Sequence, residues 1–164
     1  MKIVAYVLAF AAWSAAANVH AFQARVHKPL TAAIQFIGTL EKSSFPSNVP
    51  IELKVSLINR TKRPIYLTES NSLVDYHIEV RNEQGGLAPL TPEGKQMFLQ
   101  SMWIGRRLTI ELQPGQQKEE RFQLNKIWEM RHGSYSIIVK RKIALELGKR
   151  IVDVTSNRLM VRID

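Results

Sequence analysis

Short runs in which apolar and polar residues alternate dominate the chain from about residue 50 onward. In the clearest run, Ile51, Leu53, Val55 and Leu57 alternate with polar residues. A period of two places successive side chains on opposite faces of a β-strand. The run therefore predicts a strand with one buried face and one solvent face.

Similar runs recur along the chain and are separated by turn-forming residues. Gln84-Gly85-Gly86 and Gln113-Pro114-Gly115 are such separators, because glycine accepts positive φ and proline fixes φ in turns. We predict about seven to nine short strands, which favours an all-β antiparallel sandwich. The predicted strands are Thr31–Leu40, Ile51–Leu57, Ile65–Leu67, Tyr76–Val80, Leu108–Leu112, the segment around Phe122 and Leu124, Ile137–Leu145, Arg150–Thr155 and Leu159–Ile163.

Two segments depart from this pattern. Ala88–Gln96 contains two prolines and a glycine, which predicts a long irregular connection. Asn125–Arg131 predicts one helical turn capped by Asn125. Its apolar side chains are expected to plug one end of the sandwich; they are Ile127, Trp128 and Met130.

The first 21 residues have the layout of a secretory signal peptide. Lys2 supplies a positive start, Ile3–Trp13 is an unbroken apolar run, and Ala17 and Ala21 offer two cleavage points. A retained membrane anchor is the alternative, but the apolar run is shorter than the ~20 residues that a span needs. We therefore expect a signal peptide over residues 1–21 and a sandwich domain over residues 22–164.

The composition narrows the class of protein. A chain of 164 residues suits one domain, and the lack of cysteine excludes disulfides, thiolate metal sites and a cysteine nucleophile. The net charge of +9 is spread along the chain and not gathered into runs. It is consistent with ordinary solvent-facing lysines and arginines, or with a surface that binds anionic polysaccharide or lipid.

Several short motifs carry a family resemblance. They are Leu112–Gln116, Gly133-Ser134-Tyr135 and Ser156-Asn157 before the last strand, with Asn59 ending an earlier strand. This combination resembles the immunoglobulin-like domains of exported bacterial proteins. Its layout is also similar to that of the bacterial intracellular proteinase inhibitors of the β-sandwich type.

The resemblance spans residues 50–164 and implies structural roles. It implies a sandwich in which the hydroxyl of Tyr135 holds a nearby loop, as in a tyrosine corner. The residues to which it gives structural roles are Pro114, Gly115, Gly133, Tyr135 and Asn157. No inhibitory residue is carried over, and unlike the inhibitor group this chain has a leader.

Catalytic motifs are absent from the sequence. His20, His27, His77 and His132 lack metal-ligand spacing, and neither a phosphate-binding loop nor a nucleophile elbow occurs. The cluster Ser70, Ser72, Asp75 and His77 is interpreted as a polar strand start, and Glu119 and Glu120 point to opposite faces of a strand. We expect no enzyme activity, cofactor or metal, while a composite site of His77, His132 and an acid stays open.

One apolar segment has two interpretations. It either folds back over the core or forms a partner-binding patch, since Trp, Met and Arg are enriched at interfaces. If it is a patch, Trp103→Ala should abolish partner capture and leave the melting temperature unchanged. The candidate partner-binding residues are Met97, Phe98, Met102, Trp103, Arg106 and Arg107.

The sequence therefore predicts an exported, non-enzymatic β-sandwich module with a protein-binding or structural role. Its expected location is periplasmic or extracellular, and its expected partner is another envelope or extracellular protein. We expect neither nucleic-acid binding nor a membrane span after leader removal. Two alternatives are a protease inhibitor and a basic module that binds anionic polysaccharide or lipid.

Overall fold

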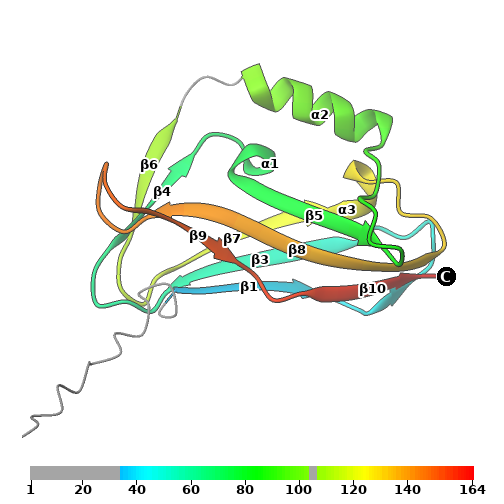
Figure 1. Ribbon diagram of the computed structural model, residues 1–164, viewed down its shortest axis with the longest axis horizontal. Coiled ribbons are helices and arrows are strands. Elements are labelled where there is room, and N and C mark those ends of the chain that lie inside the picture. The colour runs from blue at the N-terminus through cyan, green and yellow to red at the C-terminus, as the bar shows by residue number, and fades with distance from the viewer. Residues whose placement is uncertain (1–33, 104–106) are drawn as a thin grey trace, which may run out of the picture.

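The computed structural model describes residues 34–103 and 107–164, and β-strands dominate these residues (Figure 1). The prediction of a strand-rich, mostly antiparallel fold is confirmed. The strands are β1 (Ile34–Leu40), β2 (Ser44–Phe45), β3 (Glu52–Asn59), β4 (Ile65–Glu69), β5 (Tyr76–Asn82), β6 (Leu108–Leu112), β7 (Gln117–Gln123), β8 (Gly133–Ala144), β9 (Ile151–Thr155) and β10 (Leu159–Ile163). The helices are α1 (Ser72–Asp75), α2 (Pro92–Trp103) and α3 (Leu124–Ile127).

The strands form two sheets, an arrangement compatible with a β-sandwich. The smaller sheet has the order β1-β3-β7, and both of its pairings are antiparallel. The larger sheet has the order β2-β10-β8-β4-β6, with β5 and β9 also paired to β8. Only the short pairing of β2 with β10 is parallel among the described strands.

Strand β8 organises the larger sheet. At 12 residues it equals α2 as the longest described element. One edge pairs with β10 through Gly133–Ile137 and then with β9 through Lys140–Ala144. The opposite edge pairs with β5 through Tyr135–Arg141 and with β4 only at Ala144.

The core lies between the sheets and follows the alternation seen in the sequence. On β3, Leu53, Val55 and Leu57 are fully buried, while Lys54 and Ser56 face the other way. On β8, Ile137 and Val139 are likewise fully buried. These residues belong to one continuous hydrophobic cluster that both sheets supply, which accounts for a fold without disulfides.

Helix α2 corrects the prediction of an irregular connection over Ala88–Gln96. Pro92 begins the helix, where its missing N–H removes no intrahelical hydrogen bond. The hydroxyl of Thr91 accepts the N–H of Gly94 at 2.9 Å and so caps the first turn. Proline and glycine here mark the start of a helix and not an irregular loop. Figure 1 shows that α2 lies outside the strands, on the side of α1.

Helix α3 agrees with a predicted helical turn but not with its predicted cap. The turn spans Leu124–Ile127, so Asn125 lies inside it. The amide of Asn125 instead accepts the N–H of Ile51 at 3.1 Å and donates to the carbonyl of Val49 at 2.9 Å. The three apolar residues expected to plug the sandwich are buried; they are Ile127, Trp128 and Met130.

Side-chain hydrogen bonds fix several loops around the sheets. Asn59 is fully buried and donates to the carbonyls of Arg63 and Leu112, both at 2.8 Å. The hydroxyl of Tyr135 accepts the N–H of Arg131 at 2.8 Å. The side chain of Asn157 accepts a backbone N–H from β1 at 2.8 Å, and Gly115 has the positive φ of 82° that its turn requires.

The predicted signal peptide lies outside the described residues, as do His20 and His27. Within residues 34–103 and 107–164, none of the helices has the length and apolar character of a membrane span.

Candidate ligand-binding site

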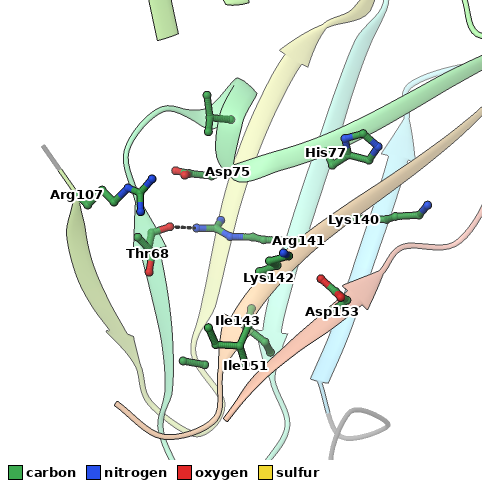
Figure 2. Close-up of a pocket in the computed structure, with 12 residues that line it drawn as sticks. Thr68, Asp75, His77, Arg107, Lys140, Arg141, Lys142, Ile143, Ile151 and Asp153 are labelled. Atoms are coloured by element: carbon green, nitrogen blue, oxygen red, sulfur yellow. Dashed lines mark hydrogen bonds between the residues drawn. The ribbon is translucent and has the colours of Figure 1, made fainter. Parts of the chain in front are cut away.

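An opening interrupts the larger sheet where β4 and β5 meet the same edge of β8. The pairing with β5 ends at Arg141, opposite Tyr76, and β4 joins only at Ala144, opposite Tyr66. The intervening Lys142 and Ile143 have no strand partner on this edge within the described chain. Helix α1, which connects β4 to β5, lies next to this opening (Figure 2).

A cavity of about 540 Å³ occupies the opening. This volume falls within the ~300–1,000 Å³ that is usual for small-molecule sites. Five basic residues line it, namely His77, Arg107, Lys140, Arg141 and Lys142, against two carboxylates, Asp75 and Asp153. Figure 2 shows that these side chains come from α1, β5, β8, β9 and the residue before β6.

Arg141 occupies an inward-facing position at the floor of this cavity. It lies on the same face of β8 as Val139 and Ile143, both of which are buried. Only 1% of its side chain is exposed. A core position that would ordinarily hold an aliphatic residue therefore carries a permanent positive charge.

The guanidinium of Arg141 is only partly satisfied. Its Nη2 donates to the carbonyl of Thr68 at 3.4 Å and lies 3.5 Å from a carboxylate oxygen of Glu69. Its carbon Cζ lies 4.2 Å from the centre of the Tyr76 ring, a cation–π contact. Nε and Nη1 are buried without a hydrogen-bond partner among the described residues.

The counter-ion of Arg141 is shared with a second cation. Lys118 Nζ lies 3.0 Å from the same Glu69 oxygen and donates to the other oxygen at 3.2 Å. Lys118 stands on the face of β7 that carries the buried Phe122, so it also points between the sheets. Two cations thus share one carboxylate, which leaves positive charge in a region where water screens it weakly.

Tyr76 separates this charge from the aromatic part of the core. Its ring centre lies 6.2 Å from that of Phe36 and 5.5 Å from that of Phe122. Burial raises the pKa of the Tyr76 hydroxyl to about 12, partly offset by the charge of Arg141. The hydroxyl therefore stays protonated, and it lacks a hydrogen-bond partner within the described residues.

Two of the residues that line the rim are already paired. Lys140 contacts Glu79, and hydrogen bonds from Lys140 and Arg81 lower the pKa of Glu79 to about 2. Asp75 accepts hydrogen bonds at 2.8 Å from both the N–H and the hydroxyl of Ser70. Ser70 carries no charge, so it does not offset that of Asp75. His77 Nε2 lies 3.4 Å from Glu79. The charges left to act on a ligand are those of Asp75, Arg107, Arg141, Lys142 and Asp153.

The candidate partner-binding residues separate in the structure. Met97 and Phe98 are partly buried and pack against the core, whereas Met102 is 77% exposed on α2. Arg107 lines the cavity. The side chain of Trp103 and all of Arg106 lie outside the described residues, so the predicted role of the segment stays a prediction.

The polar cluster between residues 70 and 77 contributes to the cavity in a way that sequence did not predict. Asp75 ends α1 and His77 lies on β5, so they are not on one strand as expected. Both nevertheless line the cavity. In the described part of the chain, no three His, Asp or Glu side chains converge as a metal site would require.

Arg141 itself escaped sequence analysis although a signal was present. Like Tyr135, Ile137, Val139 and Ile143, it is an odd-numbered residue of β8, and the odd-numbered side chains of this strand face inward.

No model of a known protein family matches the chain, and no curated protein matches it in sequence.

Proposed function

We propose that the chain is an exported, non-enzymatic immunoglobulin-like module that binds a small anionic ligand in the cavity between β4 and β5. The observation that carries this proposal is the buried, incompletely hydrogen-bonded guanidinium of Arg141 at the cavity floor. Such a group lowers the stability of a protein on balance, because unmet N–H donors and buried charge both cost free energy. A ligand anion would compensate both costs.

The cavity can attract an anion before contact is made. Arg107 and Lys142 are exposed at its rim, and no ion pair engages either of them within the described residues. Charges of one sign around a concave site focus the field and raise the local concentration of counter-ions. The rim would thus collect the ligand, and Arg141 would hold it where water is excluded.

Binding requires a small local movement. Arg141 is 1% exposed, and its contact with the Thr68 carbonyl is long at 3.4 Å. That weak contact is the one a carboxylate or phosphate oxygen would replace, since charge-assisted hydrogen bonds are shorter and stronger. The segment that must yield is the end of β4 with the four-residue α1, which pairs with no strand across the opening.

The test is a titration of the purified protein with acetate, hexanoate and inorganic phosphate, followed by backbone NMR shifts. Arg141→Met should weaken binding of the preferred anion at least tenfold, whereas Arg158→Met removes an equal charge from an exposed site outside the cavity and should change it less than twofold. Equal affinities in both variants would show that the overall basic charge binds anions, and the proposal would fail.

Export and the immunoglobulin-like assignment rest on separate support. The signal-peptide layout of residues 1–21 supports export, and a size difference between precursor and mature protein would test it. The two-sheet arrangement and the hydrogen bond from Arg131 to the Tyr135 hydroxyl support the assignment to immunoglobulin-like domains. An experimental structure with a different strand order would overturn it.

A second candidate function, binding of another envelope or extracellular protein, is favoured by the outer face of α2. Leu99 and Met102 are 62% and 77% exposed there, on a helix that Met97 and Phe98 anchor to the core. Capture of one saturable partner that is lost with Met102→Ser would support it. Met160→Ser, a comparably exposed methionine on β10, is the matched control.

A further inference from the structure

We infer that the ligand of this cavity is an organic acid with a single carboxylate and a compact apolar body. The inference rests on the proposed function and narrows it from any small anion to one chemical class. It follows from the order of side chains along β8, from the charge balance of the cavity and from two exposed aliphatic residues at its rim.

Along the cavity, the side chains that the strand register places on its outer side change from charged to apolar. Three successive cross-strand pairs face its outer side: His77 with Lys140, Lys142 with Asp153, and Ala144 with Ile151. Each step of two residues covers about 7 Å. A carboxylate held at Lys142, on this outer face, would therefore place its hydrocarbon about 7 Å away, over Ala144 and Ile151. Arg141 points to the other face of β8, so the carboxylate would reach it through the opening between β4 and β5.

The apolar end of the cavity is exposed to solvent. Ile151 is 66% exposed and Val74 is 48% exposed, and both line the cavity from different elements. Single exposed aliphatic residues are common on protein surfaces, but two on the rim of one cavity form a site for apolar contact. Ile143, buried and next to Ile151, extends this apolar wall inward (Figure 2).

Nearby carboxylates oppose a second negative charge on a ligand held at Arg141, while Arg107 adds positive charge at the rim. Asp153 lies opposite Lys142 in the sheet and offsets its charge, and Glu69 offsets part of the charge of Arg141. A dianion such as phosphate would also meet the nearby carboxylate of Asp75. A single carboxylate satisfies the unmet donors of Arg141 without this repulsion.

The experiment compares acetate, butyrate and hexanoate with inorganic phosphate and hexylammonium on the purified protein. Binding is mapped by NMR to the amides of Ile143 and Ile151. Affinity should rise about fourfold for each added CH₂, because each buries about one methylene's worth of apolar surface. Hexylammonium, with the same tail and the opposite charge, should not bind at these amides.

Two variants test the apolar end. Ile151→Thr keeps the β-branched shape of a strand residue but removes apolar surface, and it should reduce the preference for hexanoate over acetate about fourfold or more. Met160→Thr alters a similarly exposed side chain outside the cavity and should leave this preference unchanged.

The outcomes separate this inference from the proposed function. If phosphate, acetate and hexanoate bind with equal affinity at Arg141, the cavity is a small-ion site and the inference is wrong, while the proposed function stands. If no anion binds at the cavity, or hexylammonium binds as well as hexanoate, both are wrong. An unchanged preference in Ile151→Thr contradicts the inference alone.

Discussion

Replacing Arg141 with methionine should make the protein more stable while weakening the proposed anion binding at least tenfold. Methionine has an unbranched apolar side chain that fits an inward-facing position flanked by Val139 and Ile143. Most substitutions of a buried residue destabilise a protein, so a gain here would show that Arg141 is retained for another reason.

The magnitude follows from the contacts of Arg141. Its two buried donors without partners, Nε and Nη1, each cost about 1–3 kcal/mol. The cation–π contact with Tyr76 returns about 0.5–2 kcal/mol, and the shared Glu69 returns part of the remaining cost. Because Lys118 still neutralises Glu69 in the variant, we expect a net gain of about 1–2 kcal/mol in the free energy of unfolding.

Urea and thermal unfolding of both proteins measure this difference. At about 4 °C per kcal/mol for a chain of this size, the melting temperature should rise by about 4–8 °C. Arg158→Met, at an exposed position, should stay within about 0.5 kcal/mol of the wild type. A loss of more than about 1 kcal/mol in Arg141→Met would refute the reasoning, because the guanidinium would then be a net stabilising group.

Three further substitutions test separate parts of the fold by chemical denaturation. A Cβ on Gly94 would lie 2.1 Å from the carbonyl oxygen of Ile127. Gly94→Ala should therefore lower the free energy of unfolding by about 1–3 kcal/mol and loosen the packing of α2. An unchanged free energy of unfolding would mean that the helix shifts freely. Tyr135→Phe removes a hydroxyl hydrogen bond and should cost about 1 kcal/mol, against no cost if solvent replaces it. The pKa of Glu79 is lowered from 4.5 to about 2, so its ion pairs add stability that is present above about pH 4.5 and lost as the pH falls toward 2. Glu79→Gln should remove this pH dependence of the free energy of unfolding. An identical pH profile in the variant would contradict the assignment.

The strands were predictable where one face is buried and the other is wet. The alternation of Leu53, Val55 and Leu57 predicted β3 because burial on one side leaves a period of two in the sequence. Helix α2 was missed because Pro92 and Gly94 are loop formers in general, and their role at a helix start depends on the hydroxyl of Thr91 and on close packing against Ile127.

The candidate site was less predictable than the fold. The alternation of side chains along β8 places Arg141 on the face toward the core. The neighbouring Lys140 and Lys142, however, make the segment look like a solvated basic run. The cavity depends on where β4 and β5 each meet β8, which is a matter of register between distant strands. A single sequence carries no direct signal for that register.

The central place of β8 has a consequence for when the chain can fold. Four strands pair directly with Gly133–Ala144, and β2 and β6 attach through two of them. About four-fifths of the chain precedes this strand, so a growing polypeptide lacks the template for its larger sheet until synthesis is almost complete. Pairings between residues so distant in sequence also form slowly. If the protein is exported, as proposed here, this late completion of the larger sheet would leave the precursor incompletely folded through most of its synthesis.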